Sequence, residues 1–116
     1  MKVLALIWSD ESKWERLSED ERREWCGKYR AFSQAADGKV AGGDELAPTR
    51  AATTVRVRDG ETVVTDGPFA ETREQLGGYF VLDVESLDEA TELAAKIPGA
   101  WHGSVELRPA AEEEGP

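Results

Sequence analysis

Two stretches of this chain have apolar residues at both odd and even positions, and they limit what it can fold into. Lys2 to Trp8 reads KVLALIW, and Tyr79 to Val84 reads YFVLDV. Successive side chains of a β-strand point to opposite faces of a sheet, so a continuous apolar run needs cover on both faces. Both stretches are therefore predicted to be strands of a sheet that is covered front and back.

Two main helices are predicted between strands. Ser18 with Glu21 matches a capping box, and so does Ser12 with Glu15 for a short helix before it. The long helix has an apolar face at helical spacing, formed by Trp25, Tyr29, Phe32 and Ala36. The second helix begins at Ser86, with Glu89 completing the box, and ends at Pro98-Gly99. Its inner face is formed by Ala90, Leu93, Ala94 and Ile97.

Three further strand regions complete the pattern. Lys39 to Leu46 reads as a weak strand, interrupted by two glycines, and Ser104 to Arg108 as the last strand. Thr53 to Arg58 and Thr62 to Thr65 flank Asp59-Gly60, which is a strong hairpin signal. The predicted order is β-α-β, a hairpin, then β-α-β. It indicates an α+β fold, a ferredoxin-like βαββαβ sandwich with an added β-hairpin.

The predicted helices can cover only one face of such a sheet. Because the strands are apolar on both faces, the second face would be an exposed apolar patch, which soluble monomers rarely tolerate. A homodimer packed sheet on sheet, as in a dimeric α+β barrel, would cover it. The alternative is that strand edges and loops cover the second face.

Charge and composition exclude some classes of partner. The formal net charge is −10, which disfavours binding to nucleic acids and to anionic membranes. No apolar run is long enough for a transmembrane helix. Cys26 is the single cysteine, so no intrachain disulfide can form, and a cytoplasmic location is expected. We expect one domain over residues 1–109 and a disordered acidic tail over residues 110–116.

A polar loop follows the hairpin and supplies most candidate site residues. Asp66-Gly67-Pro68-Phe69 predicts a rigid turn, with Phe69 anchoring it to the core. In a functional interpretation the loop presents its carboxylates to a cleft as general acids or bases. In the alternative, Asp66 caps the turn and the other charges are solvated. The charged residues concerned are Asp66, Glu71, Arg73 and Glu74.

Other candidates are fewer. His102 is the single histidine; it suits proton transfer near neutral pH, although a strand-entry residue is the alternative. A metal site is not predicted, because no His-x-His or His-x-x-x-His spacing exists. No nucleotide-binding or hydrolase motif is present either, and no cofactor is expected. The four tryptophans, Trp101 among them, favour packing over an aromatic pocket.

The chain resembles the YCII-related, DGPF-domain proteins over nearly its whole length. DGPF at residues 66–69 is followed by AETRE at residues 70–74, a glycine pair at residues 77–78 and LDEA at residues 87–90. GGDEL at residues 42–46 and GSVELRP at residues 103–109 also fit. The resemblance implies a ferredoxin-like fold that dimerises. Members of the YCII type use a His-Asp pair with the histidine in the first half of the chain, where this sequence has none.

Three functions follow as hypotheses. The first is a homodimeric small-molecule-binding or regulatory protein, with a cleft beside the DGPF loop lined by Phe69 and Trp101 and polar contacts from Glu71, Arg73 and Glu74. The second is a cofactor-free lyase or isomerase like the family's dehydrochlorinase, with Asp66 as acid or base assisted by His102 and Glu71. The third is a protein partner in sigma-factor-linked regulation, since some family members are encoded near or fused to such factors.

Overall fold

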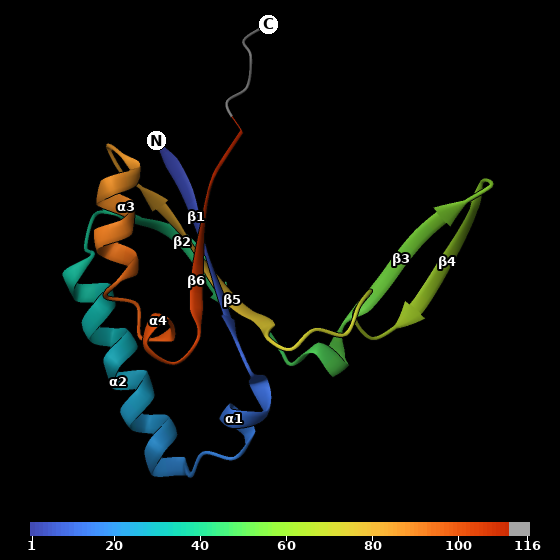
Figure 1. Ribbon diagram of the computed structural model, residues 1–116, viewed down its shortest axis with the longest axis horizontal. Coiled ribbons are helices and arrows are strands. Elements are labelled where there is room, and N and C mark those ends of the chain that lie inside the picture. Colours follow the sequence, from blue (N-terminus) through green and yellow to red (C-terminus); the bar gives the residue numbers. More distant parts are fainter. Residues whose placement is uncertain (112–116) are drawn as a thin grey trace, which may run out of the picture.

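A four-stranded antiparallel sheet is the centre of the molecule. The computed structural model describes residues 1–111, and the predicted tail lies mostly outside them. The sheet has the order β2-β5-β1-β6, and Figure 1 shows it with helices on one side. Its strands are β1 (Lys2–Ser9), β2 (Val40–Glu45), β5 (Gln75–Asp83) and β6 (Ser104–Pro109). This is the ferredoxin-like α+β fold predicted from the sequence, with both apolar runs as its central strands.

The helices begin largely where the capping residues predict. Ser18 accepts from the backbone N–H of Glu21 and Glu21 accepts from that of Ser18, which starts the long helix. The short first helix is instead capped by Asp10, not Ser12, because the Asp10 carboxylate already accepts from the Ser12 N–H. The helices are α1 (Glu11–Glu15), α2 (Glu19–Ala35), α3 (Leu87–Ala94) and α4 (Gly99–His102), with a 3₁₀ turn η1 (Thr49–Ala51).

The hydrophobic core lies between the sheet and the two longer helices. Val3, Ala5 and Ile7 of β1 point into it, and Leu82 of β5 is fully buried among them. The helices contribute the apolar faces read from the sequence. The buried helical residues are Phe32, Ala90, Leu93 and Ala94, with Ala36 as the C-cap of α2. Helix α3 ends at Ala94 and not at Pro98-Gly99 as predicted, so buried Ile97 lies after it. The core is therefore concentrated at the carboxyl end of α2 and under α3.

The opposite face of the sheet carries a second row of apolar side chains. The members of this row in β1 alternate with the core residues of that strand, and each is paired with an apolar residue of β5. None of them is fully buried in the single chain. The pairs are Leu4 with Val81, Leu6 with Tyr79, and Trp8 with Leu76. We call these six residues the open face; no helix covers it (Figure 1).

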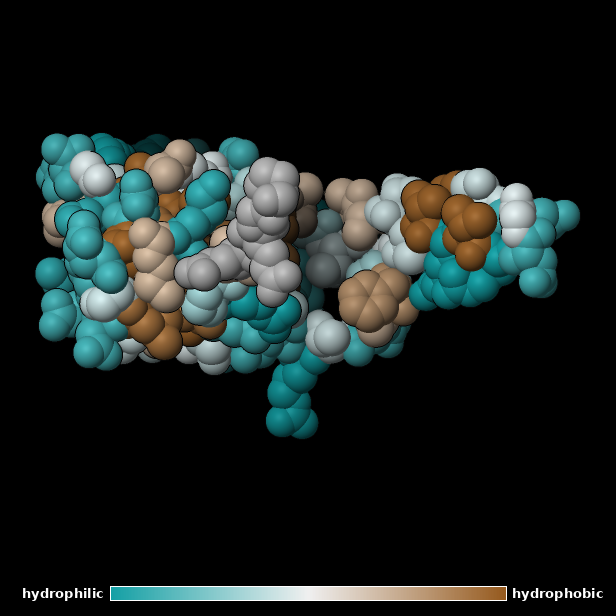
Figure 2. Space-filling view, turned by 90° about the horizontal axis from the view of Figure 1, so that it is seen from above, coloured by the Kyte–Doolittle hydropathy of each residue, from teal (hydrophilic) through white to brown (hydrophobic). Residues whose placement is uncertain are grey.

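The predicted hairpin stands apart from the sandwich. Strands β3 (Thr53–Arg58) and β4 (Glu61–Asp66) pair only with each other, and Figure 2 shows them as an arm with hydrophobic side chains. The Cα radius of gyration is 16.5 Å, against about 13 Å for a compact domain of this length. Val55, Val57 and Val64 lie on one face of the arm and are each at least 60% exposed.

The loop after the arm differs from the expectation in two ways. Strand β5 begins at Gln75, so Gly77 and Gly78 are within the strand and not in the loop before it. Phe69 is 78% exposed, and the prediction that it anchors the loop to the core is wrong for the single chain. The arm has no core of its own at its base, so the ring has nothing to pack against there.

An ion pair joins α3 to the start of β2 and gives stability a pH dependence. Lys39 Nζ lies 2.9 Å from a Glu89 carboxylate oxygen. This hydrogen bond lowers the pKa of Glu89 below 4.5 and raises the pKa of Lys39 above 10.5. The pair therefore stabilises the fold between these values; its contribution is lost as pH falls through the lowered pKa or rises through the raised one.

We expect Glu89→Gln to be destabilising only where the pair is charged. The difference in melting temperature between wild type and variant should be constant from about pH 5 to pH 10 and shrink on acidification. Thermal unfolding followed by circular dichroism across pH measures it. Glu92→Gln, an exposed change on the same helix, is the matched control. A difference that persists at acid pH would contradict the assignment.

Candidate functional site

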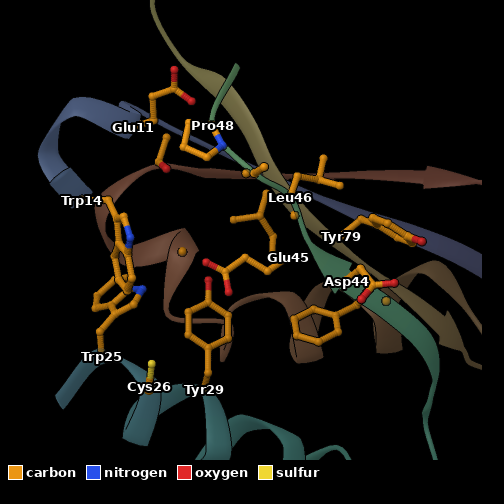
Figure 3. A pocket seen from close by; sticks show the side chains of 18 of the residues that line it. Glu11, Trp14, Trp25, Cys26, Tyr29, Asp44, Glu45, Leu46, Pro48 and Tyr79 are labelled. Carbon is orange, nitrogen blue, oxygen red and sulfur yellow. The ribbon is translucent and has the colours of Figure 1, made fainter. Parts of the chain in front are cut away.

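A large cavity lies where the helices and the sheet separate, next to the amino-terminal half of α2. It has a volume of about 550 Å³, within the range of small-molecule sites. Side chains from α1, α2, α4, β2 and β5 surround it, as Figure 3 shows. Its walls include Ile7, Trp14, Trp25, Cys26, Tyr29, Glu45, Leu46, Tyr79, Phe80 and His102. We call it the α1–α2 cavity.

One wall is aromatic because of helical spacing in α2. Trp25 and Tyr29 are one turn apart and pack edge to face, with ring centroids 5.9 Å apart. The His102 ring lies 4.9 Å from the Trp25 ring, and Trp14 of α1 stands next to Trp25 in Figure 3. Phe32, two turns after Trp25, is instead buried in the core. The same helix face therefore serves the core at one end and the cavity at the other.

A phenol and a carboxylate meet inside the cavity. Figure 3 shows the Tyr29 hydroxyl and the Glu45 carboxylate pointing toward one another, from α2 and the end of β2. Burial raises the pKa of Tyr29, a hydrogen bond with the Gly99 backbone lowers it, and the nearby Glu45 charge raises it. With its pKa raised, Tyr29 is protonated at neutral pH and can donate a hydrogen bond to a ligand or to Glu45.

Two glycines keep the cavity open. A Cβ at Gly99 would lie 2.5 Å from Ile7 Cγ2 and 3.0 Å from the Tyr29 hydroxyl. Gly43 has φ of +151° and a Cβ there would lie 2.4 Å from the Tyr79 carbonyl oxygen, so only glycine suits this close strand pairing. Gly43, one of the two glycines that weaken the β2 signal in the sequence, thus lets β2 approach β5 beside the cavity.

Helix α1 closes one side through polar contacts. The Glu11 carboxylate accepts from the Thr49 backbone N–H at 3.0 Å and from the Thr49 hydroxyl. The backbone N–H of Glu11 donates to the Gln75 side chain at 3.0 Å, and Glu15 pairs with Arg50. These bonds join α1 to η1 and to the start of β5, and they hold Trp14 over the cavity.

The predicted site residues are divided between several places. Of the predicted site residues, only His102 lines the α1–α2 cavity. A smaller cavity of about 330 Å³ lies beside the DGPF loop, and of the predicted residues only Glu71 lines it, with Pro68 and Gln75. Trp101 is 54% exposed and donates from Nε1 to the Ala95 carbonyl at 3.0 Å. Neither cavity is lined by Asp66, Phe69, Arg73, Glu74 or Trp101.

Apart from His102, the residues that line the α1–α2 cavity were not predicted as site residues. Tyr29 and Trp25 fit the apolar pattern of α2 and were predicted as packing residues. Glu45 belongs to the GGDEL segment, where an acidic residue after two glycines in a weak strand was the available signal. Within residues 1–111 no cluster of three metal-binding side chains occurs. In the same part of the chain, no helix has the length and apolar character to cross a membrane.

Comparison with known proteins adds two matches. Residues 1–113 match the family model described as the YCII-related domain. An uncharacterized protein of Rhizobium meliloti (strain 1021) is 43% identical over 118 aligned residues, which cover 96% of this chain and 93% of the relative. The matches extend through both the sandwich and the hairpin arm.

Proposed function

This chain belongs to the YCII-related domain family, and on that premise we propose that it is a homodimeric protein that binds a small molecule in the α1–α2 cavity. The observation that carries the proposal is the cavity itself, about 550 Å³ with aromatic walls and several polar side chains, four carboxylates among them. Ligand sites of proteins commonly combine these features. The smaller cavity beside the DGPF loop is only a secondary candidate.

The position of the cavity also supports binding. It borders the hydrophobic core, because Ile7 of the core also lines the cavity, as do Tyr29 and Phe80, which pack against the core. Water that fills an apolar cavity is released when an apolar ligand binds, and this release stabilises the complex. The acid–base alternative centred on Asp66 gains no such support, because Asp66 is exposed and lines neither cavity.

The proposal of a homodimer rests on the open face. Its six apolar residues form a continuous surface over β1 and β5, and a second copy of that surface would cover it. The exposed valines of the hairpin arm add to the apolar area that one chain leaves uncovered. A two-stranded hairpin is only marginally stable by itself, so the arm would also gain from a partner.

We expect small aromatic compounds to protect Cys26, because its side chain lines the cavity and is exposed in the free protein. A panel of indole, phenol and catechol is titrated while N-ethylmaleimide labels the single thiol. At least one compound should slow labelling in a saturable way. At 100-fold excess over its Kd the same compound should stabilise the fold by about 2.7 kcal/mol, measured by thermal unfolding.

Replacing either of two alanines with tryptophan makes the test specific. Ala47→Trp places an indole in the cavity wall and should abolish both the protection and the stabilisation. Ala31→Trp puts the same side chain on an exposed part of α2 that does not line the cavity, and it should preserve both effects. Protection that survives Ala47→Trp would show that the compounds bind elsewhere.

A further inference from the structure

The charged groups around the α1–α2 cavity are of one sign. Four carboxylates line it and no lysine or arginine does. Glu11 is engaged by Thr49, and Glu15 by Arg50. For the other two, Asp44 and Glu45, no ion pair or side-chain hydrogen bond is formed within residues 1–111. Of these two, Glu45 is the one that points toward the aromatic wall in Figure 3.

The aromatic rings beside Glu45 are suited to a cation. The faces of tryptophan and tyrosine rings are negative and attract ammonium and guanidinium groups. Arg22 lies 5.4 Å from the Trp14 ring centroid and Lys28 lies 5.7 Å from that of Trp25. Neither cation is among the residues that line the cavity. The two indoles therefore already make cation contacts with residues outside the cavity lining.

We propose that the ligand of this cavity is a small organic cation, an ammonium group carried on a flat apolar body. Glu45 binds the ammonium group, and Trp25 and Tyr29 pack against the body. This inference rests on the proposed function and narrows it to one chemical class. The net charge of −10 raises the local concentration of such a ligand.

The other ligand classes fit the cavity less well. An anion would meet four carboxylates with no cation among the lining residues, and like charges repel. Glu45 is exposed in the free protein. A neutral apolar ligand would cover its carboxylate without giving it a partner, and an unpaired charge is costly to bury. An amine satisfies Glu45 and the ring faces together.

Three probes of matched size test the charge. Phenethylamine is a cation, 2-phenylethanol is neutral and phenylacetate is an anion. Their affinities are measured by calorimetry and by protection of Cys26 from N-ethylmaleimide, a neutral reagent. We expect phenethylamine to bind at least about tenfold more tightly than 2-phenylethanol, and phenylacetate to bind most weakly. Added salt should weaken the binding of the amine.

Two glutamate variants locate the charge. Glu45→Gln should lower the affinity for phenethylamine about tenfold, to near that of 2-phenylethanol. Glu61→Gln makes the same change in net charge on the hairpin arm and should leave the affinity unchanged. Equal binding of amine and alcohol, or an unaltered Glu45→Gln variant, would overturn the cation inference and leave the cavity proposal standing. If none of the three probes protects Cys26, the cation inference is wrong, and the cavity proposal falls with it only if indole, phenol and catechol also give no protection.

Discussion

Leu82→Ala is expected to lower the free energy of unfolding by about 3 kcal/mol. Leu82 has no exposed surface and lies on a central strand opposite Val3. Removing its branched end leaves a hole between the sheet and the helices, and the transfer energy of the lost atoms is also forfeited. Since domains of this kind have only about 5–15 kcal/mol of total stability, the variant should lose a substantial part of it.

Urea unfolding at fixed protein concentration measures this loss, because association can add to the stability of a dimer. The matched control is Leu87→Ala, which removes the same atoms from a side chain that is 46% exposed at the start of α3. It should change the free energy by less than about 1 kcal/mol. Similar losses for the two variants would mean that Leu82 is not at the centre of the core.

Leu6→Asp is expected to dissociate the proposed homodimer. Leu6 lies in the middle of the open face, between Tyr79 of β5 and Glu106 of β6. In a sheet-on-sheet dimer the new carboxylate would be buried against apolar residues and close to Glu106, without a positive partner of its own. We expect the dimer Kd to rise by a factor of about 100 or more, measured by analytical ultracentrifugation.

The single protomer should remain folded, since Leu6 does not point into the core, and circular dichroism checks this. Leu87→Asp provides the control: it makes the same change on the helical side of the sheet, where it should leave the dimer intact. A wild-type protein that sediments as a monomer at micromolar concentration would remove the basis for the dimer. So would a Leu6→Asp variant that stays associated.

The sheet was predictable because local and long-range signals agree in it. KVLALIW and YFVLDV are apolar on both faces, and these sequences became the two central strands. Ser18 and Ser86 predict the starts of both long helices, since capping depends on residues within one turn. The prediction that Ser12 caps α1 is wrong, because Asp10 is the N-cap and its side chain accepts from the Ser12 N–H.

The site was not predictable in the same way. Its walls come from segments distant in the sequence, such as Trp14, Tyr29, Glu45 and His102, and no spacing rule connects them. Tyr29 has the same helical periodicity as the core residue Phe32. It differs from Phe32 because it lies where α2 and the sheet separate. The DGPF loop was predicted as the site because it is rich in charged residues, whereas most of its side chains are exposed at the base of the arm.

The pairing of β1 with β6 determines where a domain fused to either strand would leave the sheet. Val3 is paired with Pro109, and the Ala110 N–H donates to the Lys2 carbonyl at 2.9 Å. A tag, a surface linker or a fused domain attached before β1 or after β6 would thus leave from one corner of the sheet. Ile7 and Ser9, which line the α1–α2 cavity, are at the other end of β1. The protein can therefore be immobilised by either end with the mouth of the cavity left accessible.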